Sequence, residues 1–295
     1  MSILTPGIYF DVSWDDYCAI DAANNGSLSQ LRRSPRHFKF SPPRDETPSL
    51  RLGTLTHAAI LEPMEVLRRY VVLPDFARDE RNQTGDGRRS SARTAWVREQ
   101  EELFRVMQAG KAFVDQDELD AMIAMAAAVS SVDAARDILQ QAGRSEVTIV
   151  WQDEASNLLC KGRIDRLGPR TIGDLKTCVD LKKFQHSYRD FGYYRQMAFY
   201  ADGHAALTGQ HLTPWIVAVE KTPPYCVQAA PVHPDDLAQG RAEYREMLTL
   251  YAECKRTNEW PGPPSPESWR LPEWARRGKN EVTHFVETDT EIVAI

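Results

Sequence analysis

Three closely spaced segments near the middle of the chain have the pattern of short β-strands. They cover residues 145–151, 162–167 and 172–177, and in each one β-branched and aromatic residues alternate with polar ones. The run Gly168-Pro169-Arg170 between the last two favours a tight turn. The chain is therefore expected to build a sheet in which these strands are neighbours.

Charged residues sit at matching positions on these strands. Side chains two positions apart on a strand point to the same face, so Asp174 and Lys176 should lie together. Asp165 lies just before the turn, and we expect it to meet them on the adjacent strand. Magnesium prefers oxygen ligands and keeps several waters, so Asp165, Asp174 and the carbonyl of Leu175 are suitable ligands.

These groups have the chemistry needed to hydrolyse a phosphodiester. A metal-bound water is a strong nucleophile, and Lys176 would orient that water or stabilise charge in the transition state. A neutral imidazole at His57 would complete the metal shell, and Glu146 would hold a metal-bound water. Gln196 and Tyr200 are four residues apart on a predicted helix and would line the cleft. Taken singly, each residue also fits an ordinary structural role.

The remaining pattern predicts a mixed α/β (α+β) fold, a central mixed sheet flanked by helices, with a helical N-terminal part. Residues 1–25 are expected to be irregular. Ser27 is expected to cap a short helix that Pro35 ends. The further expected helices cover residues 52–61, 95–109, 115–142, 184–207 and 235–257, and the further strands cover 214–220 and 225–232.

The chain is expected to form one domain over residues 1–295. Within it, residues 1–142 form the helical part that carries His57, residues 143–258 form the catalytic sheet with its helices, and residues 259–295 form an irregular tail. In the helix over 115–142, Met122, Ile123 and Val129 belong to an apolar face that should be packed, and Gly143 is a suitable C-cap.

Composition limits the kinds of partner. The net charge of −6 argues against indiscriminate polyanion binding but allows a local basic channel. Arginines gather in two stretches, and we expect DNA phosphates to be bound by Arg32, Arg33, Arg36, Arg88 and Arg89. No apolar run approaches the length of a membrane span, and the five scattered cysteines include no CxxC pair. We therefore expect a cytoplasmic protein with reduced thiols.

Together, these segments resemble the PD-(D/E)xK nuclease superfamily, and most closely its RecE-type (exonuclease VIII) branch of phages and prophages. The resemblance covers roughly residues 25 to 275. Its central motifs are GTLTH at 53–57, Glu146, GRID at 162–165, GDLKT at 173–177 and QMAFY at 196–200. Three flanking segments are also similar, namely SLSQLRRSPRHF at 27–38, LEP at 61–63 and LPEW at 271–274.

The resemblance implies a metal-dependent exonuclease that degrades linear double-stranded DNA from 5′ ends and leaves 3′ single-stranded overhangs. His57, Asp165 and Asp174 would match the ligands for Mg²⁺, with Mn²⁺ as a substitute, and Lys176 would match the catalytic lysine. The overhang would pass to a RecT-like single-strand annealing protein for recombination. Relatives form closed oligomeric rings around DNA, so the same assembly is expected here.

Two other interpretations remain open at this stage. The first is another PD-(D/E)xK enzyme, either an endonuclease or a RecB-like or Cas4-like nuclease that acts on single strands. Cas4-like proteins usually carry four cysteines for an iron–sulfur cluster, and the cysteine spacing here does not match that arrangement. The second is a DNA-end-binding module without catalysis. Cleavage in the presence of magnesium distinguishes a nuclease from that module.

Overall fold

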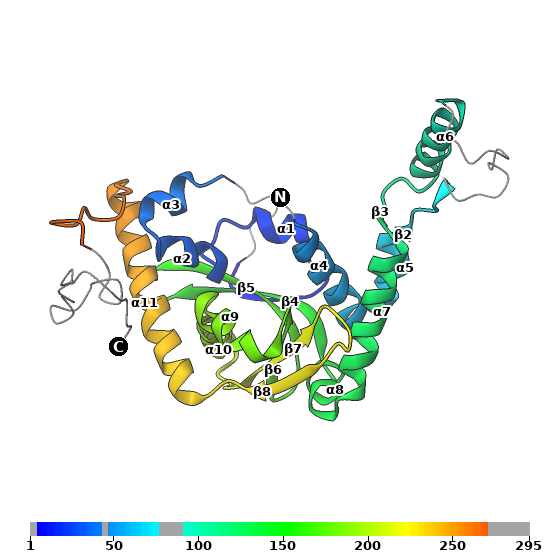
Figure 1. Ribbon diagram of the computed structural model, residues 1–295. Helices are drawn as coiled ribbons and strands as arrows, with labels where there is room; N and C mark the ends of the chain where they lie inside the picture. Colours follow the sequence, from blue (N-terminus) through cyan, green and yellow to red (C-terminus); the bar gives the residue numbers. More distant parts are fainter. Residues whose placement is uncertain (1–4, 43–46, 77–90, 271–295) are drawn as a thin grey trace, which may run out of the picture. The chain divides into compact units, whose positions relative to one another are not determined.

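The computed structural model describes residues 5–42, 47–76 and 91–270, with side chains from residue 94 in the last range. Contacts divide the chain into two units, Met1–Gly262 and Pro263–Ile295. All secondary structure described below belongs to the first unit (Figure 1). Among the described residues, no helix combines the length and the apolar character needed to cross a membrane.

One six-stranded mixed sheet organises the first unit. Its order is β1-β4-β5-β6-β7-β8; only the β6–β7 pair is parallel, and the other neighbours are antiparallel. The strands are β1 (Gly7–Tyr9), β4 (Arg144–Asp153), β5 (Leu158–Leu167), β6 (Thr171–Cys178), β7 (Thr213–Glu220) and β8 (Val227–Pro231). This arrangement confirms the predicted fold class and all five predicted strands.

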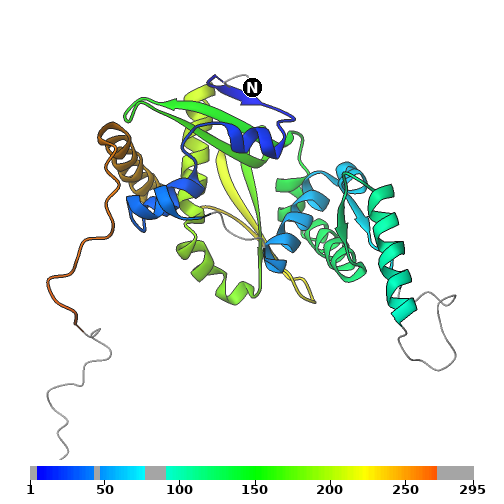
Figure 2. The same ribbon diagram turned by 90° about the horizontal axis from the view of Figure 1, so that it is seen from above.

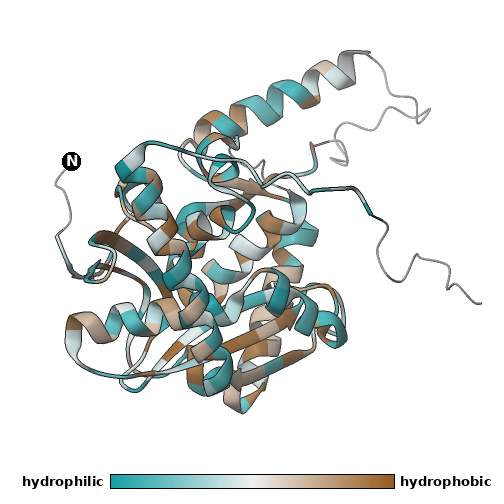
Figure 3. Ribbon diagram, turned by 90° about the vertical axis from the view of Figure 1, so that its left-hand side faces the viewer, coloured by the Kyte–Doolittle hydropathy of each residue, from teal (hydrophilic) through white to brown (hydrophobic). Residues whose placement is uncertain are grey.

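Helices cover both faces of this sheet (Figures 1 and 2). The first face packs against α10 (Tyr193–Thr208), which is joined by α2 (Asn25–Leu31) and α11 (Pro234–Thr257). The second face packs against α4 (Pro48–Leu61), α7 (Gln116–Ser131) and α8 (Asp133–Leu139). Because helices cover both faces, the strands are rich in apolar residues, which are brown in Figure 3. Each face has its own buried apolar cluster.

The remaining elements lie outside the main sheet. Strands β2 (Tyr70–Val72) and β3 (Ala112–Val114) form a separate parallel pair. The remaining helices are α1 (Trp14–Ala19), α3 (Pro35–Phe40), α5 (Pro63–Arg69), α6 (Ser91–Met107), α9 (Phe184–Asp190) and the single 3₁₀ turn η3 (Leu181–Lys183).

Two helices begin at prolines that the sequence analysis treats only as helix ends. Helix α4 ends at Leu61 as predicted but starts earlier, at Pro48, and α2 ends at Leu31, before Pro35. Pro35 then begins α3 at its first turn, where its missing N–H costs nothing, and Pro63 begins α5 in the same way. Ser27 is not the cap of α2. It lies inside that helix and forms a reciprocal capping box with Asn24, the true N-cap.

Two long predicted helices are each divided. The helix expected over 115–142 breaks at Val132 into α7 and α8, and Gln140, not Gly143, is the final C-cap. Ile123 is 55% exposed, so it does not belong to the packed face that contains Met122 and Val129. The helix expected over 184–207 breaks at Gly192, whose φ of 64° lies in the left-handed region.

The N-terminal residues are more ordered than the sequence indicates. Strand β1 pairs with β4, with Ile8 opposite Ile149, and α1 follows it. The prediction of irregular structure over residues 1–25 is therefore wrong for the described part of this segment. The missed strand is only three residues long, too short to show a period of two.

Candidate metal-dependent active site

The predicted site residues converge where β5 and β6 meet α4 and α10. Helix α4 carries His57, β4 carries Glu146, and β5 carries Asp165. Asp174 and Lys176 follow on β6, and Gln196 and Tyr200 on α10. Residues from five elements, up to 143 positions apart in the sequence (57 to 200), thus gather at one place.

His57, Glu146 and Asp165 form the part of the site that can hold a cation, and we call these three residues the ligand cluster. One potential ligand atom from each lies within 4.8 Å of the other two. His57 Nδ1 is 3.6 Å from Asp165 Oδ2, and the backbone N–H of Leu175 donates to that same oxygen at 2.7 Å. The N–H of Leu175 thus fixes the Asp165 carboxylate in place.

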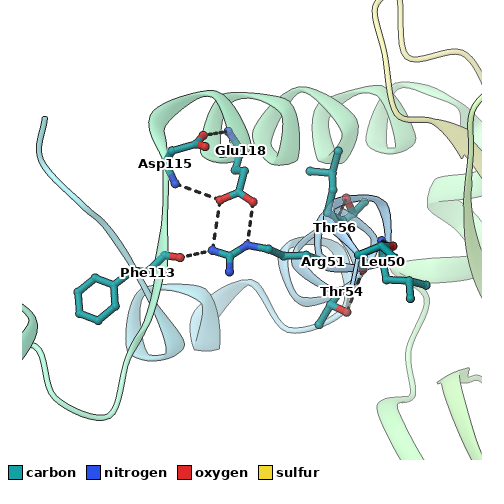
Figure 4. A network of polar contacts seen from close by, with 9 residues as sticks. Leu50, Arg51, Thr54, Thr56, Phe113, Asp115 and Glu118 are labelled. Carbon is teal, nitrogen blue, oxygen red and sulfur yellow. Dashed lines mark hydrogen bonds and ion pairs between the residues drawn. The ribbon is translucent and has the colours of Figure 1, made fainter. Parts of the chain in front are cut away.

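Helix α4 is held so that His57 reaches this cluster. At its first turn Arg51 donates to Glu118 on α7 at 2.8 Å and to the carbonyl of Phe113, as Figure 4 shows. Further along, a Cβ at Gly53 would lie only 3.2 Å from Thr177 Oγ1, so glycine permits the close approach of α4 to β6. These contacts fix the direction in which the imidazole points.

Glu146 has an unusual backbone conformation. Its φ of 53° lies in the left-handed region, which costs a non-glycine residue about 1–3 kcal/mol. The flanking pairs are Ser145 with Arg166 and Val147 with Ile164, so Glu146 lies level with Asp165 on the adjacent strand. Arg163 Nε contacts Glu146 Oε2 at 2.5 Å. The strain and the ion pair together direct the Glu146 carboxylate.

Burial determines the charge states in the ligand cluster. It lowers the pKa of His57 to about 4, and the positive charge of Lys176 acts in the same direction. Burial also raises the pKa of Asp165 well above its usual value, and the nearby Asp174 charge raises it further. Burial raises the pKa of Glu146 too, although Arg163 opposes this effect. A neutral imidazole and two carboxylates can together bind a divalent cation, and the cation would offset the charge of the two crowded carboxylates.

Asp174 and Lys176 form a second part of the site, which we call the charged pair. Lys176 Nζ lies 2.6 Å from Asp174 Oδ2, and both side chains are largely buried. Burial opposes the charge on Lys176, but Asp174 and Asp165 outweigh this effect and raise its pKa. Lys176 therefore keeps a charged ammonium, whose Nζ also lies 4.8 Å from the centre of the Tyr193 ring.

Helix α10 supports the charged pair through one amide. Gln196 Nε2 lies 3.2 Å from Asp174 Oδ1 and 3.1 Å from the hydroxyl of Tyr200, and donates to both. Burial raises the pKa of Tyr200 well above its usual value, so the phenol stays neutral. A Cβ at Gly162 would meet the Tyr200 ring at 2.8 Å, which explains why glycine stands there on β5.

The geometry differs from the predicted ligand set in one respect. The compact cluster contains Glu146, whereas Asp174 is directed to Lys176 and Gln196. The roles assigned to Asp174 and to the Leu175 carbonyl as metal ligands stay predictions. Arg163 and Tyr193 also border the site and are not among the residues that the sequence predicts for it. The strand period does indicate Arg163, because it lies two positions before Asp165 on the same strand and so shares its face.

Three of the predicted DNA-binding arginines belong to elements other than those of the candidate site, and the other two lie outside the described residues. Arg32 and Arg33 follow α2, Arg36 lies on α3, and all three are exposed. Arg36 also packs over the Phe40 ring at 5.8 Å. Arg88 and Arg89, and the segment at 271–274, lie outside the described residues. DNA contact by these five arginines stays a prediction.

Solved structures of similar shape exist. A protein from Eubacterium rectale named as a candidate exonuclease matches 88% of this chain and 97% of its own, with 12% identity and a TM-score of 0.55. An alkaline exonuclease from Laribacter hongkongensis matches 69% of this chain and 96% of its own, with 14% identity. Its TM-score of 0.28 is too low to carry an argument. At 12% identity, the first match supports the fold alone.

A search of curated proteins gave no match. In contrast, residues 30–265 match the family model described as a PDDEXK-like domain of unknown function (DUF3799). The matched residues include every member of the ligand cluster and of the charged pair. Because this match covers most of the sequence, the chain belongs to the PDDEXK-like DUF3799 family, whose core is the PD-(D/E)xK nuclease fold.

Proposed function

We propose that this protein is a divalent-metal-dependent deoxyribonuclease. The observation that supports the proposal most strongly is the position of the ligand cluster next to a buried, charged lysine. A cation bound by His57, Glu146 and Asp165 would activate water and offset charge on the phosphate. Mg²⁺ is the proposed ion and Mn²⁺ a substitute, since both accept oxygen-rich ligand sets.

The other residues would prepare the site for a phosphate. Lys176 would place its ammonium beside the reacting group and stabilise negative charge that develops there. Asp174 would hold the Lys176 ammonium in a fixed position, and the amide of Gln196 would hold the Asp174 carboxylate. Little reorganisation would then be needed during the reaction. The neutral His57 would offer a lone pair to the cation instead of repelling it.

The proposed substrate is the end of linear double-stranded DNA, degraded from 5′ to 3′ to leave 3′ overhangs. The ordered motif series that resembles RecE-type exonucleases supports this choice, as does the name of the Eubacterium rectale protein of similar fold. The exposed arginines at 32, 33 and 36, together with Arg88 and Arg89, would bind DNA phosphates.

The biological setting is proposed on the same resemblance. The overhangs would serve recombination by strand annealing, with a RecT-like annealing protein as partner, in the cytoplasm of a bacterial host. The nuclease itself would act as a homo-oligomeric ring around DNA. The oligomeric state is measured by sedimentation of the full chain with and without linear duplex.

End-labelled DNA tests the activity and its polarity. Linear duplex labelled at either the 5′ or the 3′ end is incubated with the protein in Mg²⁺, beside nicked and covalently closed circles. We expect early release of the 5′ label, resistance of the closed circle, and no cleavage in EDTA. Linearisation of the closed circle would instead indicate an endonuclease. DNA binding without any cleavage in Mg²⁺ or Mn²⁺ would indicate a non-catalytic end-binding module.

A further inference from the structure

Two large aromatic side chains near the N-terminus are exposed beside the candidate site. Phe10, directly after β1, is 49% exposed, and Trp14, the first residue of α1, is 63% exposed. Single exposed apolar residues need no explanation, but two large exposed rings on the same short, anchored segment suggest a contact surface.

The backbone that carries the two rings is tightly anchored. Strand β1 pairs with β4, and Lys161 of β5 donates to three carbonyl oxygens at the end of α1. Those carbonyls belong to Tyr17, Cys18 and Ile20, at 2.7, 3.3 and 2.8 Å from Lys161 Nζ. An ammonium at the C-terminal end of a helix is also favourable for the helix dipole. Trp14 is thus presented on a fixed support and not on a free terminus.

One guanidinium connects this surface to the ligand cluster. Arg163 contacts Glu146 at 2.5 Å, and its Cζ lies 5.9 Å from the ring centres of both Trp14 and Tyr17. Arg163 also donates to the carbonyl of Val12 at 2.9 Å. Because residues 161, 163 and 165 alternate along β5, a single strand face carries the α1 anchor, this link and the Asp165 ligand.

A second cation borders the surface. Arg144 at the start of β4 lies over the Phe10 ring, with Cζ 5.4 Å from its centre. The indole of Trp14 stacks on Tyr17 with ring centres 5.5 Å apart. Each exposed ring therefore lies next to a guanidinium group, and Arg163 links Trp14 to Glu146 of the ligand cluster.

We propose that Phe10 and Trp14, flanked by Arg144 and Arg163, form a stacking surface for unpaired nucleobases of the DNA strand that enters the site. This inference rests on the proposed nuclease function. Aromatic rings and guanidinium planes bind the π-faces of bases without regard to sequence. Asp15 and Asp16 lie in the first turn of α1 and disfavour backbone phosphates there, so the bases are the matching part of the strand.

The test measures binding and does not depend on cleavage. The full chain in EDTA is titrated with a short oligothymidylate and with an abasic oligonucleotide of equal length, which keeps the phosphates and lacks the bases. We expect the wild type to bind the oligothymidylate more tightly. Trp14→Ala should weaken that binding about tenfold and leave abasic binding unchanged. Trp14→Phe should keep most of the preference, and Phe10→Ala should lose part of it.

Two controls separate stacking from other effects. Trp269→Ala removes an indole that is 93% exposed and belongs to the C-terminal unit, and it should not change the preference. The salt dependence of binding should be the same for Trp14→Ala and the wild type, because no phosphate contact is removed. A reduced salt slope in Trp14→Ala would overturn the proposal.

The outcomes also distinguish this inference from the nuclease proposal. Equal binding of oligothymidylate and abasic DNA by a protein that cleaves in Mg²⁺ would overturn the stacking surface alone. A preference for bases that depends on Trp14, in a protein that never cleaves, would support the surface and overturn the nuclease. If Trp14→Ala dissociates an oligomer and leaves DNA binding intact, the surface is an interface between copies and the inference is wrong.

Discussion

The two parts of the candidate site are built on opposite electrostatic principles. The charged pair neutralises itself, since Lys176 and Asp174 are 2.6 Å apart and Gln196 satisfies the second oxygen of Asp174. In the ligand cluster the balance is incomplete, because Lys176 lowers the pKa of Asp165 but burial and the Asp174 charge raise it by more. Asp165 and Glu146 lie level on adjacent strands, and His57 is held neutral. Burial raises the pKa of both carboxyls, as it does for Asp174, but Asp174 has an ammonium in direct contact. Arg163 compensates Glu146 alone among these groups.

This difference indicates where an external cation belongs. A buried carboxylate that lacks a positive partner is costly, whereas one that has an ammonium partner is already compensated. The ligand cluster should therefore depend on metal for its charge balance, and the charged pair should keep its geometry without metal. Each prediction below tests this division between the two parts.

The largest expected effect is on hydrolysis, which should need both parts. Asp165→Asn removes a charge of the proposed metal ligands, and Lys176→Ala removes the charge that is proposed to stabilise the transition state. Each should lower the rate on linear duplex about 10³-fold or more, and Asp174→Asn should be similarly severe. Single-turnover cleavage of end-labelled duplex measures the rates. Near wild-type cleavage by Lys176→Ala would remove the lysine from the proposed mechanism.

Substitutions in the charged pair and in the ligand cluster should have clearly different effects on the free energy of unfolding. Lys176→Ala leaves Asp174 buried without its ammonium and should lower the free energy of unfolding by about 3–5 kcal/mol. Asp165→Asn removes a charge that the fold already disfavours, so the metal-free protein should be equally or more stable. Urea unfolding in EDTA gives both values.

A double variant serves as the control for this contrast. Asp174→Leu combined with Lys176→Met replaces the pair by apolar groups and leaves no charge unpaired, so much of the lost stability should return. If Asp165→Asn were instead as destabilising as Lys176→Ala, the carboxylate would already be compensated within the protein. The division between the two parts would then be wrong.

Metal should stabilise the fold through the ligand cluster alone. Mg²⁺ at a hundred times its dissociation constant should raise the free energy of unfolding by about 2.7 kcal/mol. Asp165→Asn should abolish the increase, while Gln196→Ala, which removes a donor to Asp174 and Tyr200 and leaves the ligand cluster in place, should keep it. Thermal melts across a Mg²⁺ titration provide the measurement. An increase that persists in Asp165→Asn would place the ion elsewhere.

The stabilisation by metal should grow with pH. Protons compete with the cation for Asp165 and Glu146, whose pKa values are raised, so Mg²⁺ should stabilise less as the pH falls. His57 is neutral in the fold down to about pH 4 and does not add to this competition near neutral pH. A Mg²⁺-induced shift in melting temperature that stays constant from about pH 8 to about pH 5 would contradict the raised carboxyl pKa values.

Without metal, His57 and Asp165 should make the free energy of unfolding depend on pH in opposite directions. The unfolded chain protonates His57 below its ordinary pKa of 6.5, while the fold resists protonation down to about 4, so this contribution falls as the pH drops through that window. The raised pKa of Asp165 means that the fold holds its proton more tightly than the unfolded chain. Its contribution is therefore present at low pH and is lost as the pH rises through the folded value.

Local sequence patterns predicted much of the sheet and of the charged pair. The alternation over 172–177 gave both the strand and the shared face of Asp174 and Lys176, because a period of two determines side-chain direction within a strand. The turn at residues 168–170 also predicted that Asp165 lies next to β6, because a tight turn pairs the two strands that it joins. The helix that carries His57 is also predicted, although it begins at Pro48 and not at residue 52.

The ligand cluster depends on tertiary geometry that no local pattern encodes. Glu146 joins it through a left-handed backbone conformation, and His57 joins it through a helix held by Arg51 and Glu118. Residues 1–25 looked irregular, yet β1 and α1 are fixed by pairing with β4 and by Lys161, more than a hundred residues away. Such contacts are long-range and leave no periodic trace in a single sequence.

The smallest expected effect concerns the amide that supports the charged pair. Gln196 donates to Asp174 and to Tyr200, so Gln196→Ala leaves two buried acceptors without one of their donors. The loss should be about 1–3 kcal/mol in the free energy of unfolding, with a moderate loss of rate. Tyr200→Phe removes only the hydroxyl that accepts from Gln196 and should cost less. Because neither residue belongs to the ligand cluster, Mg²⁺ should stabilise both variants as much as the wild type. A weaker Mg²⁺ response in Gln196→Ala would show that Asp174 turns to the metal once Gln196 releases it, and the two parts of the site would then share that carboxylate.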